Sequence, residues 1–422
     1  MKNYLPHIIK HIYLNDDIVL PGKVTGGKGF YFVFWWHDIA LGQLFIDPGK
    51  IFEYGEYVQQ IISAITPAVK FYQRQQDTEA NNWEYWLQNQ LTEEWNDWMK
   101  KLLAKWNDPQ VPYTVPVSLI ICTRNRAEQL QRCLQNLKAL SCLPQEIIVV
   151  DNAPTDNATK AITATFDGVK YVKEPRAGLD IARNTGIISA LCAIVAFVDD
   201  DVIAHPLWAY RIWESFEDSS VAAITGLVIA SELDTEAQMI FEKHWSFNRG
   251  YTDQVYDSAF FKATSPTGCP VWEIGAGANM AFRKTVFKTT GLFDELLDAG
   301  AAGCNGDSEM WFRILLKGHN IHYTPRAIVF HEHRKDMPGL KKQIFSYMRG
   351  FTSAVLIQQQ YHPASGYKKF KLRGFIRQYS KALIKQFPAY PLQYKTLLPE
   401  IKGVLSGLLF YTKNKKKSTG FK

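Results

Sequence analysis

The sequence predicts an α/β fold with a mostly parallel sheet and helices on both faces. Four short apolar runs alternate with polar loops and with segments of helical spacing. These runs lie at residues 117–122, 146–150, 169–172 and 194–198. Such alternation is typical of parallel α/β sheets. Because the carboxyl ends of parallel strands share one edge, we expect Thr123, Asp151 and Asp199 to gather there.

The first two elements after residue 115 follow a strand, loop and helix order. The run 117–122 leads into a polar loop, after which leucines recur at helical spacing from Leu130 to Leu140. The loop consists of Thr123, Arg124, Asn125 and Arg126. A further helix-like stretch opens near Gly178 and carries Arg183, ahead of the fourth run. The segment therefore predicts repeated strand and helix units.

Three consecutive carboxylates, Asp199, Asp200 and Asp201, follow the fourth run directly. Adjacent acids repel one another. At the ligand edge of a sheet they suit a hard divalent cation held on a phosphate-bearing substrate. A solvated acidic turn is the alternative, and these residues alone do not decide between the two.

Six segments resemble the family 2 glycosyltransferases of the GT-A fold. They are 117–126, 149–152, 178–186, 197–201, 275–283, and 291–295 followed by 306–313. Each is weak alone, but together they keep the family's order across residues 115–335. The resemblance implies a GT-A type, Rossmann-like sheet. It also implies an inverting, metal-dependent glycosyltransferase of the hexosyltransferase type, working in cell-surface polysaccharide or glycolipid synthesis.

The resemblance assigns a donor site and a metal site. The implied donor-binding residues are Thr123, Arg124, Asn125, Arg126, Asp151, Arg183, Asp199 and Asp200. Thr123 and Asp151 would hold the base and ribose of a nucleotide-diphosphate sugar. Asp199 and Asp201 match the family's DxD motif, whose oxygens would hold Mg²⁺ or Mn²⁺ on the two phosphates. His331 is the third candidate ligand, and a surface histidine is the alternative.

The resemblance also places the catalytic base. Asp307 matches the carboxylate that removes a proton from the acceptor hydroxyl. Gly306 stands where the family usually carries another acid, so Glu309 is the second candidate. A helix start with Asp307 as its cap is the structural alternative.

The acceptor is expected to be a glycan or a lipid-linked molecule. Residues 240–272 lie between the donor half and the base, where relatives place acceptor-binding loops. Trp245, Asn248 and Arg249 are the candidates there.

Both ends of the chain lie outside the resemblance. Residues 1–110 predict an accessory, tryptophan-rich domain, 115–335 the catalytic domain and 336–422 a basic helical tail, with a linker at 107–112. Tryptophans between residues 83 and 106 recur at helical spacing, which favours a core stripe over a sugar-stacking surface.

Charge is concentrated in the tail. The chain has a net charge of +7, but residues 334–422 hold 19 Lys and Arg against two acids, a net charge of +17. Basic residues recur every four positions beside apolar neighbours; they are Arg373, Arg377, Lys381 and Lys385. This pattern predicts an amphipathic helix that binds an anionic membrane surface or covers the catalytic domain.

Composition favours a cytoplasmic protein that is peripheral at the inner face of the membrane. No window reaches the ~18 apolar residues of a membrane span, and six cysteines show no CxxC spacing, which indicates reduced thiols. A dinucleotide oxidoreductase is a weaker class, because no glycine occurs at 123–126. A non-catalytic membrane or nucleic-acid binding protein would explain the tail but not the acids, and we expect no nucleic-acid partner.

Overall fold

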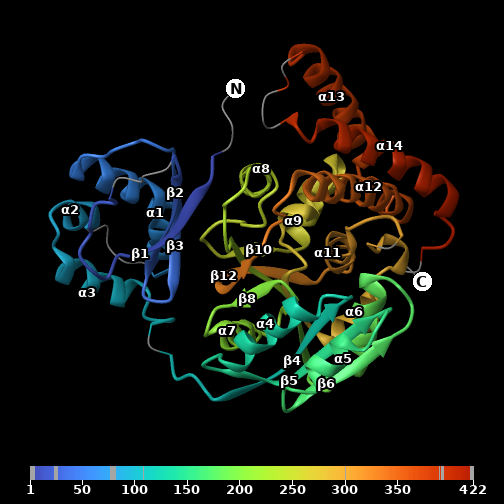
Figure 1. Cartoon of the computed structure of the whole chain (residues 1–422), viewed down its shortest axis with the longest axis horizontal. Coiled ribbons are helices and arrows are strands. Elements are labelled where there is room, and N and C mark those ends of the chain that lie inside the picture. Colours follow the sequence, from blue (N-terminus) through green and yellow to red (C-terminus); the bar gives the residue numbers. More distant parts are fainter. Residues whose placement is uncertain are drawn as a thin grey trace.

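The computed structural model describes residues 5–22, 27–76, 82–107, 109–299, 301–388, 390 and 394–418. Two β-sheets organise this part of the chain, one of three strands and one of nine. Figure 1 shows the smaller sheet and its helices beside the larger unit, with the C-terminal helices at the other side. Asp108 of the expected linker, and the outer ends of the first and last expected domains, lie outside the described residues.

The nine-stranded sheet has the order β10-β12-β9-β11-β7-β4-β5-β6, and β8 pairs with β12. The strands are β4 (Thr114–Thr123), β5 (Leu143–Asn152), β6 (Val169–Glu174), β7 (Ile194–Asp199), β8 (Val202–Ala204), β9 (Val221–Ala230), β10 (Gln254–Tyr256), β11 (Asn279–Arg283) and β12 (Asn320–His331). β4 is parallel to β5 and β7, β5 to β6, and β9 to β12. The predicted α/β fold is therefore confirmed, with β11 inserted antiparallel between β7 and β9.

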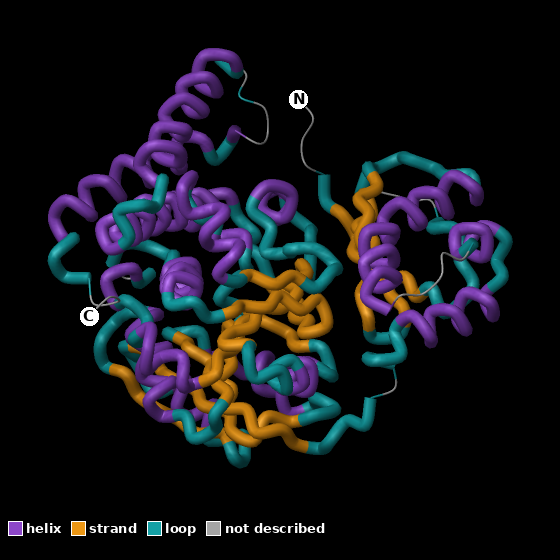
Figure 2. Tube along the Cα trace, turned by 180° about the vertical axis from the view of Figure 1, so that it is seen from behind, coloured by secondary structure: helices purple, strands orange, loops and turns teal. Residues whose placement is uncertain are grey.

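Both faces of this sheet are buried. Ile120 of β4 packs in the core on one face, whereas its neighbours Leu119 and Ile121 pack in the core on the other. Figure 2 shows the strands enclosed by helices. The helices of this unit are α4 (Ala127–Lys138), α5 (Ala158–Thr163), α6 (Leu179–Ser189), α7 (Trp208–Glu214), α8 (Glu236–His244), α9 (Ser258–Thr264), α10 (Phe287–Thr290) and α11 (Gly306–Leu316). Strands buried on both faces explain the continuous apolar runs.

The pairing register brings the polar strand ends to one edge. Thr123 at the end of β4 pairs with Asp151 at the end of β5. Cys122 pairs with Asp199 at the end of β7. The predicted gathering of these residues at the carboxyl edge is confirmed.

The N-terminal unit packs helices on its own sheet. Its strands are β1 (His7–Tyr13), β2 (Gly29–Trp36) and β3 (Ile39–Ile46), and its helices α1 (Tyr54–Gln76), α2 (Trp83–Gln88) and α3 (Thr92–Leu102). The tryptophans of α2 and α3 are buried except for half-buried Trp86, which favours a core role. The stripe expected from 83 to 106 does not lie on one continuous helix. The helical conformation is interrupted between α2 and α3, where Gln90 has a φ of +53°.

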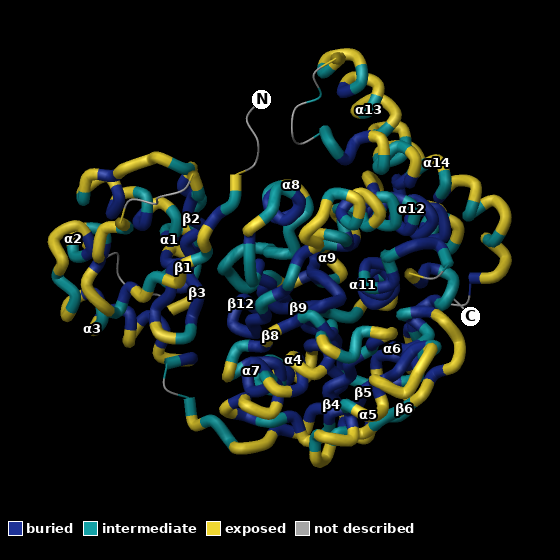
Figure 3. Tube along the Cα trace, in the orientation of Figure 1, coloured by how far each residue is buried: buried dark blue, intermediate teal, exposed yellow. Residues whose placement is uncertain are grey.

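The C-terminal region packs on the larger unit through α12 (Met337–Tyr361). It continues through the turn η5 (Tyr367–Leu372), α13 (Arg373–Lys385) and α14 (Leu397–Asn414). Helix α14 lies close against α12, since a Cβ on Gly407 would be 2.6 Å from the Arg349 carbonyl oxygen. Helix α13 is mostly exposed (Figure 3). None of the helices described here is both long enough and apolar enough to cross a bilayer.

Candidate active site

A cavity of about 1250 Å³ lies beside the carboxyl edge of the large sheet. Its lining includes six of the candidate site residues: Arg183, Asp199, Trp245, Asn248, Arg249 and Asp307. Pockets for small molecules typically measure ~300–1,000 Å³. The cavity therefore has room for more than one small substrate.

The second carboxylate of the acidic turn is held by two partners. Thr123 Oγ1 donates to Asp200 Oδ2 at 2.6 Å, and Arg126 donates through Nη1 to Asp200 Oδ1. Arg126 Nη2 also donates to Asp201 Oδ2 at 2.7 Å. Burial raises the pKa of Asp200 to about 6, against the charge of Arg126. These contacts fix the turn after β7 and commit the Thr123 hydroxyl to Asp200.

Asp199, Asp201 and His331 come together at the end of β7. One ligand atom from each lies within 4.8 Å of the others. His331 Nε2 is 3.4 Å from Asp201 Oδ1 and 4.0 Å from Asp199 Oδ2. Burial and the neighbouring Asp201 raise the pKa of Asp199 to about 7. Burial lowers the pKa of His331 to about 4, so its ring is neutral near pH 7.

A chain of buried hydrogen bonds determines which nitrogen of His331 carries the proton. His333 Nε2 lies 3.0 Å from Glu242 Oε2, and an ionised carboxylate only accepts, so this nitrogen donates. In the neutral ring His333 Nδ1 is then an acceptor, and His331 Nδ1 donates to it at 3.2 Å. The lone pair of His331 is left on Nε2, the atom that faces Asp201.

This arrangement fits a divalent cation. Within the described part of the chain, Asp201 Oδ1 is buried and has no hydrogen-bond partner. It faces His331 Nε2, which is also an acceptor, so a cation between them would remove an unfavourable contact. Carboxylate oxygens and a neutral imidazole are suitable ligands for Mn²⁺, and the carboxylates alone suit Mg²⁺.

Arg183 brings a fixed positive charge into the cavity. Its Nη1 donates to Asp180 Oδ1 at 2.9 Å, and its charge also acts on Asp199 and Asp307. Arg183 belongs to α6, and Asp298 holds the start of that helix. The Asp298 carboxylate accepts from the backbone N–H groups of Leu179 and Asp180, at 2.7 and 2.8 Å. The guanidinium therefore projects from a helix start that is itself anchored.

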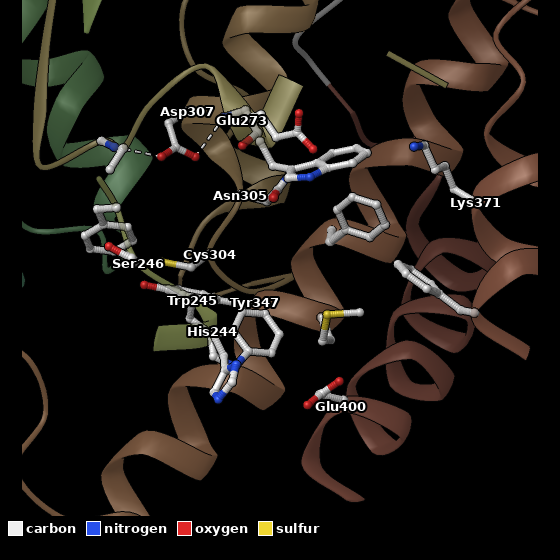
Figure 4. A pocket seen from close by; sticks show the side chains of 18 of the residues that line it. His244, Trp245, Ser246, Glu273, Cys304, Asn305, Asp307, Tyr347, Lys371 and Glu400 are labelled. Carbon is white, nitrogen blue, oxygen red and sulfur yellow. Dashed lines mark hydrogen bonds between the residues drawn. The ribbon is translucent and has the colours of Figure 1, made fainter. Parts of the chain in front are cut away.

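Asp307 lies at the start of α11 and faces the cavity (Figure 4). Its Oδ2 accepts from the N–H of Gly277 at 2.8 Å, and its Oδ1 accepts from the N–H of Ser308 at 2.7 Å. A Cβ on Gly306 would lie 2.0 Å from Asp180 Oδ2. The glycine at this position thus makes room for Asp180, which explains the departure from the family pattern.

Glu309 lies outside the lining of the cavity. Its side chain is fully buried, and both of its oxygens accept from Arg313, each at 2.7 Å. Arg313 also donates to the carbonyl oxygens of Thr290 and Leu292. Glu309 is therefore part of a buried ion pair that ties α11 to the preceding loop.

The loop after α8 closes another side of the cavity and contacts the N-terminal unit. Asn248 Nδ2 donates to Gln43 Oε1 of β3 at 3.0 Å. Arg249 donates to the carbonyl oxygens of Ser246 at 2.6 Å and Trp272 at 2.9 Å. The Arg249 guanidinium thus holds the shape of the loop, and the Asn248 side-chain amide attaches the loop to β3.

The remaining candidates lie at the strand edge but outside the cavity lining. Arg124 and Asn125 are exposed, and Asn125 Oδ1 accepts from the Thr155 N–H at 3.1 Å. Tyr171 donates to Asp151 Oδ2 at 2.8 Å. Among the described residues, Asp151 Oδ1 is buried without a hydrogen-bond partner.

Glu242, His333, Asp180 and Asp298 were assigned no role from the sequence, where His331 was preferred to His333 as the candidate ligand. His333 follows His331 by two residues, and alternate residues of an extended strand share a face, so the HxH spacing was an available signal. Glu242 lies 91 residues away from His333. No local pattern connects the two.

Comparisons with known proteins find similarity to glycosyltransferases. Residues 118–291 match the model of glycosyl transferase family 2. The pre-mycofactocin glycosyltransferase of Mycobacterium tuberculosis is 23% identical over 54% of this chain and 45% of its own length, so the chain spans under half of that relative. Glycosyltransferase AglE of Haloferax volcanii is 27% identical over 54% of this chain and 71% of its own length.

Two further similarities extend over more of the chain. The succinoglycan biosynthesis protein ExoM of Rhizobium meliloti is 25% identical over 70% of this chain and 94% of its own length. The solved structure of the mannosyltransferase PcManGT from Pyrobaculum calidifontis, in complex with GDP-Man and Mn²⁺, is 17% identical with a TM-score of 0.46, covering 74% of this chain and 93% of that chain. Through residues 118–291, the chain is similar to glycosyl transferase family 2.

Proposed function

We propose that this chain transfers a sugar from a nucleoside diphosphate sugar to an acceptor hydroxyl, with inversion at the anomeric carbon. The observation that supports this most directly is that Asp307 and Asp199 line the same cavity. One is a carboxylate held at a helix start, and the other belongs to a cluster that fits a divalent cation. The match to family 2 and the name of ExoM support glycan synthesis as the setting.

Asp307 is the proposed general base. Its two oxygens each accept one backbone N–H, which fixes the carboxylate while leaving lone pairs free for the acceptor hydroxyl. As the proton passes to Asp307, the hydroxyl oxygen forms a bond to the anomeric carbon. The bond from that carbon to the diphosphate oxygen breaks on the opposite side, and nucleoside diphosphate leaves.

Asp199, Asp201 and His331 would hold Mg²⁺ or Mn²⁺. When bound, the ion would stabilise the negative charge that grows on the departing diphosphate. Arg183 would add a second positive charge, since it lines the same cavity. Asp151 would accept from the base or ribose through its unpartnered Oδ1.

The other donor-site residues would have two roles, holding the acidic turn in place and contacting the nucleotide. Thr123, Arg126 and Asp200 would hold the acidic turn in place, because their polar groups bind one another. Arg124 and Asn125 are exposed beside them and would contact the nucleotide. On the acceptor side we propose Trp245, whose ring can stack on a sugar, with Asn248 and Arg249 shaping the loop.

We also propose that the C-terminal helices attach the enzyme to an anionic membrane surface. Helices α13 and α14 expose apolar side chains that include Ile376 at 68%, Ile384 at 77% and Leu409 at 63%. Basic residues alternate with them, and the region 334–422 carries +17. Apolar burial and attraction to anionic lipids act together in such helices.

The function is tested by nucleoside diphosphate release from a panel of sugar nucleotides, with a glycan or lipid-linked acceptor and Mn²⁺ or Mg²⁺. We expect release with one donor and loss of release in excess chelator, because the diphosphate charge is then unscreened. Undiminished release of nucleoside diphosphate in chelator would show that the transfer does not require a metal. Failure of the protein to bind any nucleoside diphosphate would contradict the proposed function.

Two substitutions separate the candidate bases. Asp307→Asn should lower turnover ~10²–10⁴-fold, the usual contribution of a general base, with donor affinity unchanged. Glu309→Gln should instead lower the free energy of unfolding by about 3–5 kcal/mol, because it removes the carboxylate charge that offsets the buried Arg313 guanidinium. Turnover and urea denaturation are measured for both variants. Normal turnover of Asp307→Asn would show that the base is elsewhere.

The hydrogen-bond chain behind His331 is tested by Mn²⁺ binding. His333→Phe keeps a ring but removes the acceptor for His331 Nδ1, so Mn²⁺ affinity should fall ~10–100-fold. His322→Phe, on β12 but outside the cluster, is the matched control. Electron paramagnetic resonance of bound Mn²⁺ gives the affinity without a turnover assay. If His333→Phe binds Mn²⁺ as tightly as wild type, His333 does not support metal binding through His331.

Membrane attachment is tested by co-sedimentation with vesicles that contain 30% phosphatidylglycerol. Ile376→Ser with Ile384→Ser should lower the bound fraction on the order of tenfold, since burying each chain contributes up to ~1.5–3 kcal/mol. Ile188→Ser with Leu191→Ser removes equally exposed apolar side chains from the end of α6 and the loop after it, and serves as the control. Salt should weaken wild-type binding by screening. A loss that is equal in both pairs would contradict attachment through α13.

A further inference from the structure

The cavity that contains Asp199 and Asp307 is also lined by the C-terminal region. Side chains of η5 and α13 line it, among them Lys371, Phe375, Tyr379, Lys381 and Lys385. Figure 4 shows Lys371 and Glu400 across the cavity from Asp307. The tail is therefore part of the wall around the candidate active site as well as an exposed surface.

The cationic groups of this wall are not neutralised by protein carboxylates. Among the described residues, no carboxylate oxygen lies within 4.0 Å of the Nζ atoms of Lys371, Lys381 or Lys385. Glu400 lines the cavity too, but its Oε1 accepts from Thr396 at 2.7 Å. Lysine ammonium groups in such a place are suited to bind phosphate oxygens.

Apolar rings separate these lysines. Phe375 stacks on Tyr379 with ring centroids 5.7 Å apart and contacts Phe351 of α12 at 5.5 Å. Lys371 Nζ lies 5.0 Å from the ring centroid of Trp272, which lines the cavity as well. On the outside of the same helix, Ile376 and Ile384 are exposed. A ligand that follows this wall outward would meet cations first within the cavity and an apolar surface beyond it.

We propose that the wall formed by η5 and α13 is the acceptor subsite, and that it takes a sugar acceptor joined through a phosphate to a hydrocarbon chain. The phosphate lies against Lys371, Lys381 and Lys385, and the hydrocarbon leaves along α13. This inference rests on the proposed function, since it assigns the donor to the Asp199 side of the same cavity. The volume of about 1250 Å³ accommodates both substrates.

A soluble anionic glycan would also be attracted by lysines. Such a glycan would make no apolar contact with the exposed side chains of Ile376 and Ile384. The combination of cations and apolar side chains therefore favours an amphipathic acceptor. The tail then takes part in acceptor recognition in addition to attaching the enzyme to lipid.

The test uses the full chain and decyl phosphate, below its micelle concentration, in isothermal titration. Lys381→Gln with Lys385→Gln should weaken binding on the order of tenfold or more, because hydrogen bonds to a charged group are lost. Lys402→Gln with Lys413→Gln removes two tail charges that do not line the cavity and should change affinity less than about threefold, a surface-charge effect. Equal losses in the two pairs would overturn the subsite.

Two further ligands test the two parts of the acceptor. Decyl maltoside has the same chain without the charge, and inorganic phosphate has the charge without the chain. Each should bind at least tenfold more weakly than decyl phosphate. If decyl maltoside binds as tightly as decyl phosphate, the lysines do not recognise the acceptor. If inorganic phosphate binds as tightly as decyl phosphate, the hydrocarbon chain does not contribute to binding.

Donor binding is measured separately on the same variants. Nucleoside diphosphate with Mn²⁺ should bind wild type and both lysine pairs with equal affinity, because the donor lies at Asp199. If nucleoside diphosphate binds but decyl phosphate does not, the acceptor subsite is wrong and the proposed function stands. If no nucleoside diphosphate binds, the proposed function fails, and this inference fails with it.

Discussion

The crowding of carboxylates at one edge of the large sheet is the constraint on which the site depends. Asp199 ends β7, Asp200 and Asp201 follow it, and the negative charge of each of the three is balanced differently. Asp200 is bound by Thr123 and Arg126, and Asp201 shares Arg126. Asp199 Oδ2 and Asp201 Oδ1 face His331, and among the described residues Asp201 Oδ1 has no hydrogen-bond partner. Arg126 thus balances part of the negative charge of the turn, and the cluster of Asp199, Asp201 and His331 fits a further cation.

The same principle links the candidate base to the metal cluster. Arg183 lies near Asp180, Asp199 and Asp307, so one guanidinium offsets charges that belong to α6, β7 and α11. Asp180 occupies the space that a side chain at position 306 would need. An acid therefore comes from α6 where the family pattern has one on α11.

The two regions outside the family match both support the cavity. Gln43 of β3 accepts from Asn248, so the N-terminal unit holds the loop that carries Trp245. From the other side, η5 and α13 supply lysines and aromatic rings to the lining. Neither region is separate from the site. This joint lining explains why the sheet of the family alone encloses only part of the cavity.

The sequence by itself determined the α/β fold, the strands β4 to β7 and the meeting of Thr123, Asp151 and Asp199, because apolar periodicity and strand ends are local properties. Tertiary structure alone decided that Glu242 orients His333 and that α13 lines the cavity, because these contacts join residues by packing rather than by spacing. The pairing of Glu309 with Arg313 follows the local i,i+4 spacing of α11. That this pair is buried away from the cavity, whereas Asp307 of the same helix faces it, depends on the elements packed around α11.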